Sequence, residues 1–162
     1  MSSYGRVLEA LAKGCAILAG MLLTFITLLT CVSLIGRNTS GATLVGDFEL
    51  TGVVAGAAIA LFLPWCQFRR GNIIVDFFTA RASAQTTGRL DRFGALLLAV
   101  CMAILGWRTT LGGINAYDTH SSTMMLGFPE WIVYACIAPP LLLTALVAAT
   151  QAVMGFGDRA ST

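Results

Sequence analysis

Charged side chains are scarce in this chain: Asp, Glu, Lys and Arg together make up 11% of its 162 residues. Soluble domains carry about a quarter of such residues. Hydrophobic residues reach 57% here, and the mean hydropathy is +0.81. This composition predicts an integral membrane protein. The net charge of +2 is too small to indicate a nucleic-acid partner.

Motifs for catalysis, metal binding and cofactor binding are missing as well. No glycine loop followed by lysine is present to cradle phosphates, which argues against ATP-driven work. The one histidine, His120, lies outside the apolar runs, so a transmembrane haem would lack its paired axial ligands. The five cysteines are spaced singly and are predicted to be small apolar residues of helix faces. We therefore expect no enzyme activity, no cofactor and no metal.

Four apolar runs are long enough to cross a bilayer, whose hydrocarbon core of about 30 Å needs roughly 20 residues of helix. They cover residues 14–35, 48–65, 93–111 and 131–154. The first run is too long for the core of a signal peptide, and no convincing cleavage site follows it, so we expect it to remain as an anchor. The prediction is an all-α integral membrane fold, in which residues 1–162 form a single domain of four transmembrane helices.

The distribution of Lys and Arg predicts the orientation of these helices, because positively charged flanks stay in the cytoplasm. Eight basic residues fall on one side of the expected spans: Arg6, Lys13, Arg69, Arg70, Arg81, Arg89, Arg92 and Arg159. Arg37 and Arg108 flank the other side. The acidic residues that gather on that other side are Asp47, Glu49, Asp118 and Glu130. Both termini are therefore expected in the cytoplasm.

The second span carries a stripe of small residues after an acidic start. Glu49, Gly52, Gly56 and Ala60 follow one another at intervals of three or four and share one helix face. Small residues let helix backbones approach closely in a membrane. Ala95, Ala99 and Ala103 repeat this pattern in the third span. Packing inside a four-helix bundle and contact with another subunit both remain open as explanations, with Glu49, Gly52, Gly56 and Ala60 as candidates for a partner interface.

Three prolines fall near the end of the second span or inside the fourth. Pro64 fits a helix that ends close to it, because proline removes a backbone hydrogen bond. Pro139 and Pro140 are expected to kink or locally open the fourth helix.

An amphipathic segment is predicted between the second and third spans. Its polar face consists of Asn72, Asp76, Thr79 and Ser83, and its apolar face of Ile73, Ile74, Phe77 and Phe78. Arg69 and Arg70 precede it, where they can meet anionic headgroups. We expect this segment at the cytoplasmic membrane surface or under a partner, with Asp76 close to the two arginines and Phe77 seated in the interface.

Charged residues are expected only at the ends of the spans, because the middle third of each contains no ionisable side chain. Glu49 and Glu130 stand at helix starts, where a carboxylate complements the helix dipole. Arg37 and Arg108 are expected at the ends of the first and third helices on the same side. Either arginine is a candidate to pair with Glu49 and so to tie two helices together.

Several of these features, in this order, resemble the small permease subunit of tripartite ATP-independent periplasmic (TRAP) transporters, the DctQ-like family. They are Arg37 after the first span, the acidic start GDFEL at residues 46–50, the small-residue second helix, GNIIVDFF at residues 71–78 and FPEWIVY at residues 128–134. The family usually has histidine where this chain has Asn72. That departure argues against an essential protonation step at position 72.

The resemblance implies a non-catalytic subunit of a three-part importer in the bacterial inner membrane. A periplasmic substrate-binding protein would capture an organic anion, and a large permease subunit would move it with a sodium or proton gradient. The small subunit would scaffold the large one within the lipid bilayer. This agrees with the lack of internal repeats and of a polar site at mid-membrane, which a self-contained transporter needs.

Three other classes remain as alternatives. A four-helix membrane anchor of a redox complex has this size, but the single histidine counts against it. A small drug exporter would need a carboxylate inside its first helix, whereas Glu9 precedes that span. A structural membrane protein with no transport role is separated from the leading interpretation only by its partners.

Overall fold

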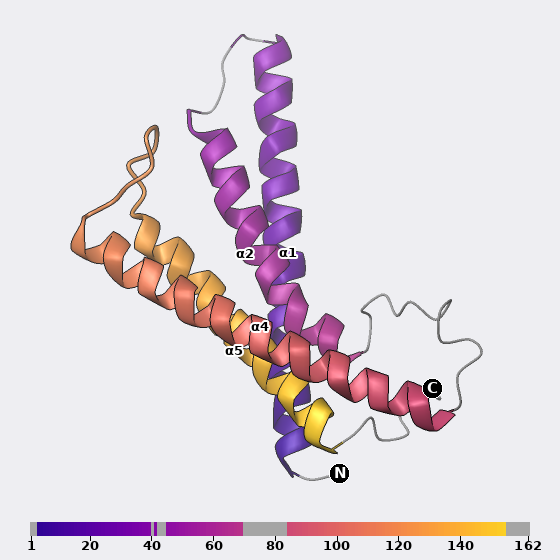
Figure 1. Cartoon of the computed structure of the whole chain (residues 1–162). Coiled ribbons are helices and arrows are strands. Elements are labelled where there is room, and N and C mark those ends of the chain that lie inside the picture. Colours follow the sequence, from indigo (N-terminus) through magenta and orange to yellow (C-terminus); the bar gives the residue numbers. More distant parts are fainter. Residues whose placement is uncertain (1–2, 40, 42–44, 70–83, 155–162) are drawn as a thin grey trace.

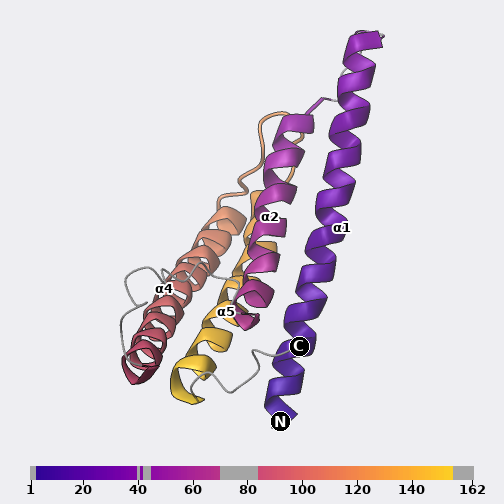
Figure 2. The same cartoon turned by 90° about the vertical axis from the view of Figure 1, so that its right-hand side faces the viewer.

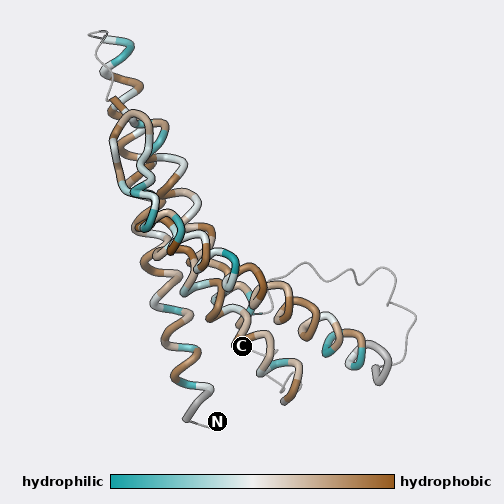
Figure 3. Tube along the Cα trace, turned by 60° about the vertical axis from the view of Figure 1, so that its left-hand side comes forward, coloured by the Kyte–Doolittle hydropathy of each residue, from teal (hydrophilic) through white to brown (hydrophobic). Residues whose placement is uncertain are grey.

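Four long helices account for nearly all of the described chain. The computed structural model describes residues 3–39, 41, 45–69 and 84–154 (Figure 1). The helices are α1 (Ser3–Thr39), α2 (Asp47–Phe68), α4 (Ala84–Asp118) and α5 (Glu130–Met154). Each is long and apolar enough to cross a membrane. Figure 3 shows hydrophobic residues along all four helices, as expected for helices that meet lipid or other apolar helices on most sides.

The helices include the four predicted spans and extend beyond them. The largest differences are in α1, which begins eleven residues before the predicted start at residue 14, and in α4, which begins nine residues before residue 93 and continues seven residues past residue 111. Hydropathy marks only the part of a helix that suits hydrocarbon. Good helix formers such as Leu8, Glu9 and Ala10 then continue α1 into water.

The helices are arranged in a row. α1 packs on α2, α2 on α5, and α5 on α4, whereas α1 and α5 touch only slightly. Figure 2 shows the order α4, α5, α2, α1 across the molecule, and Figure 1 shows the α4–α5 pair inclined to the α1–α2 pair. The described part of the chain is therefore an open row of two helical hairpins, joined by the α2–α5 contact, and not a closed bundle.

The α1–α2 contact uses small residues at seven-residue intervals. Ala12, Ala19, Ile26 and Ser33 are the buried residues of α1. Ala19 packs with Ala58 and Leu61 of α2, with Cys15 and Leu22 beside them. A seven-residue period is typical of helices that cross at a shallow left-handed angle. Such packing is stable without large side chains, because small ones bring the backbones together.

Glycines of α4 make the closest approach to α5. A methyl group added at Gly106 would lie 2.7 Å from Leu142, and one added at Gly113 would lie 2.9 Å from the Cβ of Tyr134. Tyr117 and Trp131 meet edge to face with ring centroids 5.9 Å apart. These pairs fix the antiparallel register of the hairpin.

The alanine stripe predicted on the third span is only partly buried in α4. Ala95 and Ala99 are buried, but Ala103 is exposed. The stripe therefore follows the buried face of α4 for one turn and then leaves it, whereas Gly106 and Gly113 continue that face.

Prolines do not end the helices in which they lie. α2 continues past Pro64 to Phe68, and α5 is one helix through Pro139 and Pro140. The hydroxyl of the buried Thr144 donates to the carbonyl oxygen of Pro140 at 2.8 Å. Because proline has no backbone N–H, the carbonyls that lose a helical partner are those of Ala135 and Cys136, four residues before the two prolines.

Candidate functional site

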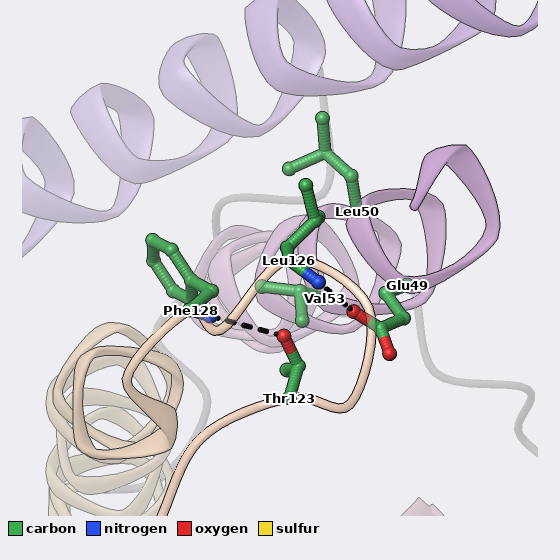
Figure 4. A pocket seen from close by; sticks show the side chains of 6 residues that line it. All are labelled: Glu49, Leu50, Val53, Thr123, Leu126 and Phe128. Carbon is green, nitrogen blue, oxygen red and sulfur yellow. Dashed lines mark hydrogen bonds between the residues drawn. The ribbon is translucent and has the colours of Figure 1, made fainter. Parts of the chain in front are cut away.

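Glu49 joins the α1–α2 hairpin to the loop between α4 and α5. Its two carboxylate oxygens accept the backbone N–H groups of Met125 and Leu126, at 2.9 and 3.1 Å (Figure 4). The sequence suggested Arg37 or Arg108 as partners of Glu49, but the structure gives the carboxylate these two N–H groups instead. A charged acceptor makes a stronger hydrogen bond than a neutral one.

Glycine at position 46 permits this contact. Gly46 precedes α2 in a left-handed conformation with φ of 81°, and a side chain there would collide with Leu126. Leu126 also lines a small hollow beside Glu49, together with Leu50, Val53, Thr123 and Phe128 (Figure 4). The first turn of α2 and the α4–α5 loop thus fit against each other through both polar and apolar atoms.

The α4–α5 loop, residues 119–129, holds its shape through its own hydrogen bonds. Thr123 N–H donates to Phe128 O at 2.9 Å, and Phe128 N–H donates to the Thr123 hydroxyl at 3.1 Å. Gly127 N–H donates to Thr123 O, with Gly127 in a left-handed conformation (φ 61°). The tip therefore presents Met124 fully exposed and Met125 largely exposed on a rigid turn.

A second contact links the hairpins at their opposite end. Gln67 of α2 donates its side-chain N–H to the Gln151 side-chain oxygen at 2.7 Å, and Gln151 donates to the backbone oxygen of Gln67 at 3.0 Å. Gln67 is buried. Gln151 thus adds a hydrogen bond to a carbonyl in the last turn of α2, where backbone acceptors are in excess.

Sequence reasoning missed this pair of glutamines. The available signal was the presence of one glutamine near the end of each of two otherwise apolar runs, because a polar amide there needs a partner. Ser33 was also missed. Its hydroxyl donates to the Asp47 carboxylate and ties the end of α1 to the start of α2.

The four residues of the predicted stripe on α2 do not share one contact surface. Glu49 contacts the α4–α5 loop, and Ala60 is buried within the chain. A methyl group added at Gly52 or Gly56 would meet no atom within 4 Å. Within the part of the chain that is described, these two glycines therefore pack against nothing.

Of the three charged residues predicted at helix ends, two lie there and one lies within a helix. Arg37 is exposed in the last turn of α1, and Glu130 is the first residue of α5, as expected. Arg108 differs from its prediction, because α4 continues ten residues beyond it to Asp118. It is an exposed residue within the helix and not at its end.

Arg69 follows α2 and is exposed, with its guanidinium 5.5 Å from the centroid of the Trp65 ring. Trp65 also stacks on Phe68. Arg70, Asp76 and Phe77, and the amphipathic segment that contains the last two, lie outside the described residues. In the described ranges, no group of three His, Cys, Asp or Glu side chains is placed to hold a metal ion.

Comparison with known proteins identifies one family. The model of the DctQ component of tripartite ATP-independent periplasmic transporters matches residues 26–157, which include the last part of α1, from residue 26 to residue 39, and all of α2, α4 and α5. No curated protein and no solved structure gives a significant match. The match covers most of the chain, and four helices fit to cross a membrane agree with a multi-pass membrane protein. The chain therefore belongs to the DctQ family, the small membrane component of TRAP transporters.

Proposed function

We propose that this protein is the non-catalytic scaffold of a secondary-active TRAP importer of organic anions in the bacterial inner membrane. The observation that carries the proposal is the DctQ match over residues 26–157. The large permease subunit moves the anion, driven by an ion gradient. The small subunit holds the static part of the large one within the bilayer.

The uncovered apolar surface of the helix row supports the scaffold role. α1 and α4 each have one neighbour in the row, and large apolar side chains are exposed along both. On α1 these include Met21, Phe25, Leu28 and Val32. A row of helices offers two broad faces to the bilayer, so one face remains for lipid when the other receives a large membrane partner.

Both termini lie in the cytoplasm in this proposal. The excess of Lys and Arg on that side supports it, because such residues are retained there during insertion. The α4–α5 loop then faces the periplasm, with Met124 and Met125 at its tip and the exposed Asp118 and His120 near it. This loop is a candidate contact for the periplasmic substrate-binding protein, since exposed methionines have flexible apolar side chains that adapt to a protein surface.

Co-purification tests the proposal directly. The tagged chain, extracted from native membranes in mild detergent, should bring down a multi-spanning permease in near-equal amount. Recovery of the chain alone, or only with copies of itself, would contradict the scaffold role. Absorbance of haem or quinone in the purified material would instead indicate the anchor of a redox complex.

A glycine substitution locates the contact. Gly56→Leu should leave the fold of this chain intact, because no atom lies within 4 Å of a methyl group added there, yet reduce recovery of the large subunit. Gly20→Leu is the matched control, since that glycine of α1 is also half-buried and also has no atom within 4 Å of an added methyl group. Full recovery with Gly56→Leu would place the contact elsewhere.

A further inference from the structure

The position of Arg108 along the helix axes follows from the register of α4 against α5. Gly106 lies against Leu142, Gly113 against Tyr134, and the two helices run antiparallel. Arg108 is two residues from Gly106 toward Gly113, so it is level with Pro140. α5 begins at Glu130, ten residues before Pro140, which is about 15 Å of helix.

The register of α2 leads to the same depth. α2 and α5 run in the same direction, and Gln67 pairs with Gln151. Gly56, eleven residues before Gln67, is therefore level with Pro140. It lies near the middle of α2, which extends from Asp47 to Phe68. Arg108 is thus level with the midpoints of two spanning helices, although the sequence placed it at the end of a span.

Arg108 lies on a side of α4 that no described residue covers. Gly106 is buried against α5, whereas Arg108 is exposed, and so are its neighbours on the same helix face, Ile104 and Leu111. Within the described ranges no hydrogen bond or ion pair holds the guanidinium. Arg108 therefore combines three properties: a level near the midpoints of α2 and α5, exposure, and a charge that no described residue pairs.

A guanidinium at this depth needs an anion. Charged residues inside membranes are rare and face protein or water, where they are paired. An arginine near a helix end reaches the interface by extending its side chain. Arg108 would have to do so over a depth of about 15 Å.

The described residues of a second copy of this chain do not provide the anion. The described acidic residues lie toward the ends of their helices and not at the level of Arg108. They are Glu9, Asp47, Glu49, Asp91, Asp118 and Glu130. The anion must therefore come from another protein that crosses the membrane beside α4.

We infer that Arg108 forms an intramembrane ion pair with a carboxylate on a spanning helix of the large permease subunit. This inference rests on the proposed scaffold function and identifies one face of α4, with Ile104, Arg108 and Leu111, as part of the subunit interface. The pair specifies register: an apolar helix can slide along α4, whereas a helix with a buried carboxylate has one favourable position.

The test compares the isolated chain with the complex. Arg108→Leu should insert and fold in the isolated chain at least as well as the wild type, because it removes an unpaired charge from lipid. In the complex, the same substitution leaves the partner's carboxylate buried and unpaired, and recovery of the large subunit should fall by about tenfold or more. Arg89→Leu is the control, since it removes an exposed arginine near the other end of α4 and should leave recovery unchanged.

Carboxylate capture then identifies the partner. In an Arg108→Lys complex, a membrane-soluble carbodiimide should join the new amine to the facing carboxylate as an amide, with loss of water, and mass spectrometry locates the cross-link. A cross-link to an acidic residue in a spanning helix of the large subunit supports the inference. Unchanged recovery with Arg108→Leu, or reaction of an Arg108→Cys variant with a membrane-impermeant thiol reagent, overturns it while leaving the scaffold role intact. Failure of the wild-type chain to recover a large subunit overturns both.

Discussion

At the scale of single residues, glycine decides how closely α4 and α5 approach. Gly113 faces the Cβ of Tyr134, an atom fixed to the backbone of α5. Gly113→Ala should force the helices apart and destabilise the protein by about 1–3 kcal/mol. Chemical unfolding in micelles measures this.

Gly94→Ala is the matched control on the same helix, because nothing lies within 4 Å of its added methyl group. Helix propensity favours alanine over glycine by about 0.5–1 kcal/mol, so this variant should be as stable as the wild type or more so. Equal stability of the two variants would mean that the contact at Gly113 is looser than the structure gives.

Glu49 is the residue on which the position of the α4–α5 loop depends. Glu49→Ala should raise amide hydrogen exchange at Met125 and Leu126 by roughly tenfold or more, because both N–H groups lose a charged acceptor. Glu130→Ala removes a carboxylate from the same end of the molecule and should leave those two amides protected. Unchanged exchange in Glu49→Ala would show that the loop's internal hydrogen bonds suffice.

At the scale of the helices, the α2–α5 contact joins two hairpins that otherwise touch little. Gln67→Leu and Gln151→Leu should each cost roughly 0.5–2 kcal/mol, the range of hydrogen bonds between membrane helices. The double variant should cost less than the sum, because the hydrogen bond between the two side chains can be lost only once. Additive costs in an unfolding experiment would show that the two amides act independently.

At the scale of the whole molecule, the proposed orientation rests on the distribution of charge, and the α4–α5 loop offers a test of it. In a variant without native cysteines, Ser122→Cys should react with an impermeant thiol reagent added to the periplasmic side. Arg89→Cys should react only after the membrane is opened, because the basic end of α4 faces the cytoplasm. The reverse pattern would invert the proposed topology and move the loop away from any periplasmic partner.

Some properties of this protein follow from the sequence alone. Four apolar runs and few charges predict an all-α membrane protein, because spanning a bilayer depends on hydropathy and length, which are local. The acidic start of the second span and FPEWIVY at residues 128–134 carry the resemblance to the DctQ family, which the family match over residues 26–157 confirms. The helix ends were less predictable, since a helix extends into water wherever its residues favour it.

The contacts between helices depend on how segments that are far apart in the sequence pack together. The order of the helices in the row depends on contacts between residues more than seventy positions apart in the chain. Two such contacts are those of Glu49 with Met125 and Leu126, and of Gln67 with Gln151. Hydropathy carries no information about the register between two helices. For that reason the sequence placed Arg108 at the end of a span, and only the packing of Gly106 on Leu142 and of Gly113 on Tyr134 shows that it is level with the middle of α5.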